Sequence, residues 1–195
     1  EKIVNMTPKM KMGKSFFTLI LVIAVIVVLA LNSFVIVNAG QRGIVLQLGA
    51  VRPVVLSEGL HFKIPFVQNV VPVEVRVQKS QTEQTAASKD LQTVSTTVAV
   101  NFHLDPNQVN KLYQHVGLAY GERIVDPAIG ESVKAITAQY TAEELISKRS
   151  EVSSKIKEIL SAKLATYYMV LDEINITEFK FSEEFNNAIE QKQID

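Results

Sequence analysis

Three histidines are the residues of this sequence with the widest chemical range, because imidazole ligates zinc and moves protons near neutral pH. His61, His103 and His115 fall on three different expected elements, and the chain contains no cysteine. A zinc site needs three or four converging ligands. We therefore predict that the chain binds no metal and no other cofactor.

Two adjacent pairs also have residue types used in catalysis. Ser88 and Lys89 have the identities of a serine–lysine pair, but neighbouring residues of an extended segment point to opposite faces. Glu143 and Glu144 begin an expected helix, where carboxylates favour the helix dipole. The sequence has no GxSxG, GxxxxGK[ST], GxGxxG or HExxH motif. These patterns predict a protein that is not an enzyme.

Composition limits the partners and size of the chain. It has 195 residues, 47% of them hydrophobic, and a formal net charge of zero. This length allows one domain with additional segments. A nucleic-acid-binding protein needs a basic stripe to attract phosphates, and the sequence has none. We therefore exclude nucleic acid as a partner.

An uncharged run from Phe16 to Val37 predicts a transmembrane helix. Seventeen of its 22 residues are Leu, Ile, Val or Phe, and each favours the bilayer centre by roughly 0.3 to 0.6 kcal/mol. Val37 and Ala39 also fit the small-residue positions of a signal-peptidase site, but the apolar stretch of a cleavable leader is shorter, about 7 to 15 residues. We expect the helix to be retained.

Basic residues predict the orientation of this helix. Four lysines precede it and two arginines follow within 20 residues, which favours a cytoplasmic N-terminus. These residues are Lys2, Lys9, Lys11, Lys14, Arg42 and Arg52. The expected organisation is a cytoplasmic segment 1–15, a span 16–37, a folded domain 38–181 on the other side, and a helix start at 182–195.

Alternating apolar and polar residues predict antiparallel strands with one solvated face. The apolar members are Ile44, Leu46, Leu48; Leu60, Phe62, Ile64, Phe66; Val71, Val73, Val75, Val77; Val94, Val98, Val100, Phe102, Leu104; and Ile174, Ile176, Phe179, Phe181. The last group changes phase, which predicts a bulge near Thr177 and Glu178. These strands and the helices that follow predict an α+β fold with a curved, mostly antiparallel sheet.

The segment GLHFKIPFVQ begins about twenty residues after the apolar run, so it has two interpretations. The first is an interfacial segment in which Phe62, Ile64, Phe66 and Val67 enter the bilayer and Lys63 contacts headgroups. The second is ordinary sheet core, which explains the same alternation. Both interpretations remain open from the sequence.

Helix-start signals follow the strands. Asp105–Pro106 and Asp126–Pro127 each predict a capped helix start, and Thr141 with Glu144 predicts a capping box. Apolar residues at helical spacing supply the buried stripes; they are Val125, Ile129, Val133, Ile136, Tyr140, Leu145, Val152, Ile156, Ile159, Leu160, Leu164 and Tyr167.

Ser182 predicts the cap of a last helix. Phe185 and Ile189 begin its apolar seam, as in a coiled coil, and we expect the native chain to continue past Asp195.

Five segments together resemble the prohibitin family within the SPFH superfamily (stomatin, prohibitin and flotillin). They are NAGQRGIVLQLGAV, EGLHFKIPFVQ, SKDLQTVSTTVAV, GERIVDPAIGESVKAITAQYTAEELISKRSEVS and LDEINITEFKFSEEFNNAIEQKQ, from about Asn38 to Gln193. The resemblance implies a membrane-anchored scaffold with an SPFH domain and a long coiled coil. It also implies homo-oligomeric rings or cages on membrane lipids, no agreed catalytic residues, and regulation of an associated AAA-type membrane protease.

The long apolar span and the absence of an arginine-rich presequence favour a bacterial cytoplasmic membrane, with the domain in the periplasm, over the mitochondrial inner membrane. The alternative functions are a monomeric lipid-binding module and a component of a membrane protease.

Overall fold

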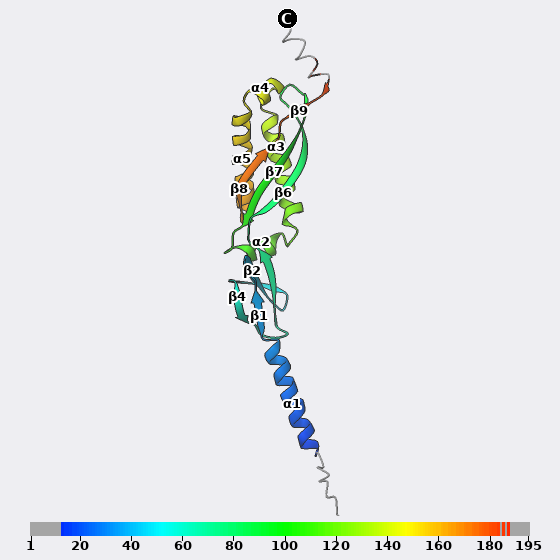
Figure 1. Cartoon of the computed structure of the whole chain (residues 1–195), viewed down its shortest axis with the longest axis vertical. Coiled ribbons are helices and arrows are strands. Elements are labelled where there is room, and N and C mark those ends of the chain that lie inside the picture. The colour runs from blue at the N-terminus through cyan, green and yellow to red at the C-terminus, as the bar shows by residue number, and fades with distance from the viewer. Residues whose placement is uncertain (1–12, 184, 186, 188–195) are drawn as a thin grey trace, which may run out of the picture.

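The computed structural model describes residues 13–183, 185 and 187 of an α+β chain. The molecule is elongated, with α1 at one end, small sheets beside it, and a larger sheet covered by helices beyond them (Figure 1). The strands are β1 (Phe34–Val37), β2 (Gln41–Gln47), β3 (Ala50–Leu56), β4 (Gly59–Phe62), β5 (Gln68–Glu74), β6 (Gln78–Ala87), β7 (Thr93–Leu104), β8 (Met169–Ile176) and β9 (Lys180–Phe181). The helices are α1 (Lys14–Leu31), α2 (Val109–His115), the π-helix η1 (Gly121–Val125), α3 (Asp126–Thr137), α4 (Ala142–Ser147) and α5 (Arg149–Thr166).

Helix α1 is long and apolar enough to cross a membrane, but it ends at Leu31 rather than at Val37. The side chains of Asn32 and Ser33 donate to the carbonyl oxygens of Val28 and Leu29, at 2.8 and 2.6 Å, at the point where the helix stops. Residues Phe34–Val37 instead form β1, so the expected span of 22 residues was too long at its C-terminal end. Eighteen helical residues reach about 27 Å.

Two small sheets follow α1. Strand β1 pairs with β4, and the second sheet has the order β3-β2-β5, with all pairs antiparallel. The strand expected across residues 60–66 ends at Phe62, because the chain turns at 65–67 and Phe66 has a φ of +65°. Leu60, Phe62, Ile64 and Phe66 therefore do not share one strand face, as the alternation had suggested.

The larger sheet has the order β6-β7-β8, with β9 also paired to β7. The expected strand at β7 is confirmed, and its residues Val94, Val98, Val100, Phe102 and Leu104 are buried. Strand β6 was not expected, because its sequence QKSQTEQTAA has no apolar alternation. The irregularity expected near Thr177 is confirmed as the gap between β8 and β9, where the Thr177 N–H donates to the Thr97 carbonyl.

The helices cover one face of this sheet. The Thr141–Glu144 capping box of α4 is confirmed. Helix α3 does begin at Asp126, but the expected cap at this residue is wrong: the chain enters α3 directly from η1, the N-cap position is Val125, and no side chain caps it. The Asp126 carboxylate instead accepts a hydrogen bond from the Ser80 hydroxyl. The helix expected after Asp105 begins only at Val109, because Asp105 accepts hydrogen bonds from the Asn107 N–H and the Gln108 side chain. The expected third helix is divided at Lys148 into α4 and α5. Their apolar stripe forms the core with β7 and α3: Leu145, Val152, Ile156, Leu160 and Leu164.

The start of the last helix is also confirmed at its cap. The Phe185 N–H donates to the Ser182 hydroxyl at 3.3 Å, and the rings of Phe185 and Phe181 lie 5.1 Å apart. Ile189, the other expected seam residue, lies outside the residues that the structure describes.

Candidate membrane-contact surface

Large apolar side chains are exposed together at the end of the domain that adjoins α1. We call this set the proximal surface; its members are Phe34, Ile36, Leu48, Leu60, Phe62, Ile64 and Phe66. Four of them come from the two-stranded sheet, whose register places Phe34 opposite Phe62 and Ile36 opposite Leu60. The Phe34 and Phe62 rings meet edge to face, with centroids 6.0 Å apart. A two-stranded sheet has two faces, and here one face packs inward through Val37 while the other remains exposed.

The other members lie in two turns that hydrogen bonds hold beside the sheet. The Lys63 N–H donates to the Ser33 carbonyl at 2.7 Å, which ties the turn to the end of α1. The Leu48 N–H donates to the Val67 carbonyl at 2.9 Å, which joins the β2–β3 turn to the 63–67 turn. Leu48 and Phe66 both have positive φ and are both 81% exposed. Such backbone conformations are uncommon for bulky residues.

A groove of about 450 Å³ lies between these turns and the end of α1. It is lined by Asn32, Leu46, Leu48, Gly49, Lys63, Phe66, Val67, Gln68 and Asn69. Its lining combines apolar side chains with one cation, Lys63, and the amides of Asn32, Gln68 and Asn69. This combination suits a surface with an apolar layer beneath a polar layer.

The structure brings the five residues suggested for membrane contact to this end of the domain. Phe62, Ile64 and Phe66 are exposed, while Lys63 and Val67 are partly buried. The sheet-core interpretation is wrong for the three exposed residues, which pack against no buried core. Sequence reasoning missed Phe34 and Ile36, because their alternation was hidden within the apolar run assigned to the helix. It also missed Leu48 and Leu60, which were assigned to strand faces.

A charged clamp fixes the connection between the two-stranded sheet and the rest of the domain. Arg76 donates from Nε and Nη2 to the two carboxylate oxygens of Glu74, each at 2.7 Å. These hydrogen bonds lower the pKa of Glu74 to about 2. Gly40, with φ +79°, turns the chain beside Arg76, and a Cβ at this position would lie 2.6 Å from the Arg76 Cδ. The turn therefore favours glycine through its positive φ, and the Arg76 side chain packs where a Cβ would lie.

The residues considered for chemistry have separate local partners. The histidine side chains face different groups: His61 the Ser57 carbonyl, His103 the carboxylate of Asp172, and His115 the Lys111 carbonyl. Among residues 13–183, 185 and 187, no group of three or more His, Cys, Asp or Glu could hold a metal.

Ser88 closes the turn between β6 and β7. Its hydroxyl donates to Asp90 at 2.6 Å and accepts from the Gln92 N–H at 3.0 Å. Asp90 also accepts from the Ala142 N–H, and these bonds, led by that from Ser88, lower its pKa. Ser88 thus links the turn to the start of α4 through Asp90. Lys89, the other member of the serine–lysine pair considered above, donates its backbone N–H to the Tyr140 carbonyl.

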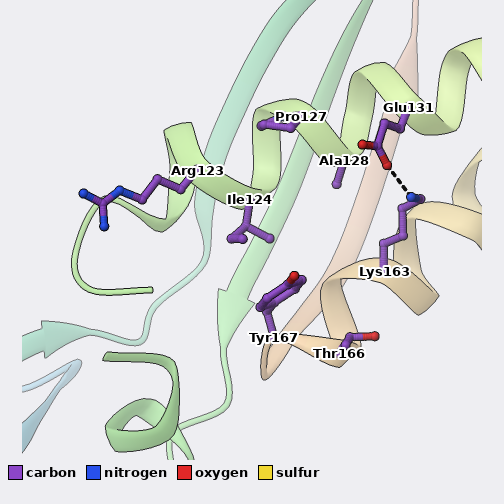
Figure 2. Close-up of a pocket in the computed structure, with 8 residues that line it drawn as sticks. All are labelled: Arg123, Ile124, Pro127, Ala128, Glu131, Lys163, Thr166 and Tyr167. Atoms are coloured by element: carbon purple, nitrogen blue, oxygen red, sulfur yellow. Dashed lines mark hydrogen bonds and ion pairs between the residues drawn. The ribbon is translucent and has the colours of Figure 1, made fainter. Parts of the chain in front are cut away.

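A second hollow, of about 320 Å³, lies between α3 and α5, away from α1. Figure 2 shows Ile124 and Tyr167 facing each other across it, while Arg123 points away. The Lys163 Nζ and Glu131 Oε2 form an ion pair at 2.5 Å, and Arg123 donates to the Val116 carbonyl at 2.7 Å. The charged groups of this hollow are thus paired with neighbours, and its geometry assembles no nucleophile with a base.

Comparison with known proteins agrees with this architecture. The model of the SPFH domain / Band 7 family matches residues 35–195, and the chain belongs to this family. It is similar to Prohibitin-1 of Colletotrichum higginsianum (38% identical over 160 residues; 81% of this chain, 58% of the relative). It is also similar to Prohibitin-7, mitochondrial, of Arabidopsis thaliana (36% over 159; 81% and 57%) and Prohibitin-2 of Gallus gallus (34% over 165; 84% and 55%).

These relatives confirm the resemblance to prohibitins that the sequence segments indicated. The chain spans a little over half of the length of the relatives named here.

Proposed function

We propose that this chain is a membrane-anchored scaffold whose SPFH domain rests on the bilayer through the proximal surface. Membership of the SPFH/Band 7 family supports a membrane scaffold. The observation that carries the contact is continuity: α1 ends at Leu31, and the exposed side chains of β1 begin three residues later at Phe34. Strand pairing places β4 beside β1, and a hydrogen bond to the Ser33 carbonyl holds the 63–67 turn at the same point. Burial of apolar area of this kind stabilises a protein at the lipid interface.

The anchor has a specific consequence for the domain. Because the Lys63 N–H is bonded to the Ser33 carbonyl, the 63–67 turn cannot move far from the membrane end of α1. When α1 is inserted in the bilayer, Phe62, Ile64 and Phe66 lie in the headgroup region, and Lys63 lies at the level of the lipid phosphates. The proximal surface thus sets the distance between the domain and the membrane.

We further propose that many copies assemble side by side into a ring or cage that confines membrane proteins and lipids. Family membership and the helix that starts after Ser182 support this assembly. The resemblance to prohibitins also implies that this chain regulates an associated AAA-type membrane protease. To test this role, we would compare the turnover of the protease's membrane substrates in cells with and without this chain, and we expect it to differ. A monomeric lipid-binding module is the alternative, and the mass of the complex in mild detergent separates the two.

For location, we propose a single-pass protein with a cytoplasmic N-terminus and the SPFH domain across the membrane. The long apolar span and the absence of an arginine-rich presequence favour a bacterial membrane, whereas the name of one relative, Prohibitin-7, mitochondrial, favours the mitochondrial inner membrane. Protease added to sealed vesicles whose cytoplasmic face is outward should cut the lysine-rich N-terminal segment and leave the domain intact. Cleavage of the domain in these intact vesicles would reject this orientation.

The cysteine-free sequence permits a direct test of the proximal surface. An environment-sensitive dye is attached to the full-length chain through Phe66→Cys, and in a matched variant through Leu91→Cys, an equally exposed apolar residue in the β6–β7 turn. In membranes, the dye at position 66 should emit as in an apolar medium and be quenched by lipid-borne quenchers, while the dye at position 91 should emit as in water. Equal, water-like emission at both positions would refute the proposed contact.

A further inference from the structure

The larger sheet has two edges that carry no further strand within the part of the chain shown in Figure 1 as ribbon. One is β6, which pairs with β7 through ten consecutive positions with no register shift and contains no proline. Long regular edge strands of this kind are templates for another strand, and monomeric proteins usually protect them with proline, bulges or a covering segment. Strand β6 carries the charged residues Lys79 and Glu83, and α3 packs against one of its faces, but no proline or bulge interrupts its ten paired positions. This regular length indicates a partner strand.

The other edge is β8, which forms the floor of an open groove beside α5. The groove measures about 540 Å³ and is lined by Arg149, Ser150, Ser153, Ser154, Lys157, Ile174 and Ile176. Arg149 donates to the Ile176 carbonyl at 2.9 Å, so a backbone group of this strand is already used as an acceptor outside the sheet. A groove between a helix and an edge strand is a common receptor for an added strand.

The directions of the two edges determine which strand can be added. Both β6 and β8 are antiparallel to β7, so they run in the same direction. The strands of this sheet lie along the long axis of the molecule, as α1 does (Figure 1). Copies anchored in one membrane stand the same way up, so an antiparallel pair of β6 edges would require one inverted copy. When the β6 edge of one copy lies beside the β8 edge of the next, both copies keep the same orientation in the membrane.

We propose that β6 of each copy pairs in parallel with β8 of its neighbour, so that the larger sheets join into one continuous belt around the assembly. This inference rests on the proposed oligomeric scaffold and names its lateral contact. The contact is heterologous, because two different edges meet, and such a contact repeats around a symmetry axis until a ring closes. It also keeps the helices of every copy on the same face of the belt.

The sheet register supplies the relative height of the two edges. Gln81 is opposite Ala99 of β7, and Ala99 is opposite Asn175 of β8, so Gln81 and Asn175 lie at one level. Rotation about an axis normal to the membrane preserves that level. Gln81 of one copy should therefore lie beside Asn175 of the next. Within one copy the two residues are two strand spacings apart, about 9.5 Å, which exceeds the limit of about 7 Å between Cα atoms for a disulfide.

This separation makes a cysteine cross-link specific for the contact between copies. The full-length chain with Gln81→Cys and Asn175→Cys is oxidised in membranes and separated on non-reducing gels. We expect a ladder of covalent oligomers from this variant. Two controls should remain monomeric on the gel. One is Gln81→Cys alone, and the other is Gln81→Cys/Val170→Cys, in which the β8 cysteine lies on the order of 15 Å nearer the membrane than position 175. Gln81→Cys/Ala99→Cys, directly opposite within one copy, verifies oxidation by an internal disulfide.

The outcomes separate this inference from the proposed function. The size of the cysteine-free parent complex in the same membranes is measured first. If the parent is monomeric, both the scaffold and the edge pairing are wrong. If the parent forms large complexes but the 81/175 variant gives no ladder, the edge pairing alone is wrong. Dimers from Gln81→Cys by itself would also reject it, because like edges would then meet.

Discussion

Arg76 and Glu74 show how two surface residues fix the position of a functional element. Their paired hydrogen bonds place the Arg76 side chain against Gly40, in the turn that connects β1 to β2. The Gly40 N–H also lies 3.3 Å from the carboxylate of Glu58, and its carbonyl accepts from the Val75 N–H. These contacts hold the two-stranded sheet, and with it the proximal surface, against the second sheet.

The clamp predicts a pH dependence of stability. The pKa of Glu74 is about 2 in the folded chain and 4.5 ordinarily. A carboxylate with a lowered pKa stabilises the fold above its unfolded pKa, and this stabilisation is lost as the pH falls from about 4.5 to 2. Arg76→Ala should raise the Glu74 pKa toward 4.5, as measured by NMR titration. It should also lower stability at pH 7, with the difference from the parent shrinking below pH 4.5.

Arg52→Ala removes another exposed arginine and should leave the Glu74 titration unchanged. An unaltered Glu74 pKa in Arg76→Ala would show that the ion pair does not form in solution.

The turn conformations of two residues of the proximal surface were beyond the reach of pattern analysis, although Phe66 was among the residues suggested for membrane contact. Leu48 and Phe66 continue apparent strand alternations in the sequence, yet both adopt positive φ and lie in turns. Alternation reports which side chains would share a face if the strand continued. It does not report where a strand stops, and here the stop depends on hydrogen bonds between the turns: Leu48 to Val67 and Gln68 to Ile64.

At the scale of elements, helix starts were more predictable than strand ends. The capping box of α4 depends on residues within four positions: the Glu144 N–H donates to the Thr141 hydroxyl at 3.3 Å, and the Thr141 N–H donates to Glu144 at 3.1 Å. Strand β6 depends on residues far along the chain, since β7 and α3 provide its partners, including the Ser80–Asp126 hydrogen bond at 2.7 Å. A polar segment paired in this way has no local signal.

The capping box gives a prediction for stability. Thr141→Ala removes the side-chain acceptor for the Glu144 N–H, and substitution of an N-cap typically costs about 1 kcal/mol of unfolding free energy. Chemical denaturation followed by circular dichroism measures this loss. Thr166→Ala, at the exposed C-terminal end of α5, is the matched control and should change the free energy by less than about 0.5 kcal/mol. Equal effects of the two substitutions would contradict the role of the box.

At the scale of the whole molecule, the boundary between the apolar helix α1 and the domain lies at residues 32–33. Val37 is 2% exposed and belongs to the strand that pairs with β4. A deletion of residues 1–37 therefore removes β1 of the domain as well as α1, whereas a deletion of 1–31 leaves every strand of the domain in place. The two deletions differ by six residues and test what each part contributes.

We expect the 32–195 fragment to be folded and the 38–195 fragment to be less stable, because β4 then has no partner and the buried side chain of Val37 no longer packs beside Gly43 of β2. Thermal unfolding and dye binding to exposed apolar surface compare the fragments. Both should assemble poorly without lipid, because α1 is absent. Large lipid-free rings from 32–195, or equal melting temperatures for the two fragments, would refute these expectations.

The sequence by itself determined the apolar N-terminal helix, the α+β class, the capping box of α4 and the resemblance to prohibitins, because each depends on composition or on residues close along the chain. Only the tertiary structure decided that β1 leaves the apolar run, that β6 is a strand, and that Phe34, Leu48, Phe62 and Phe66 gather on one surface. The physical reason is that strand pairing and turn closure join residues distant in sequence. The free energy of these contacts depends on partners that no local pattern contains.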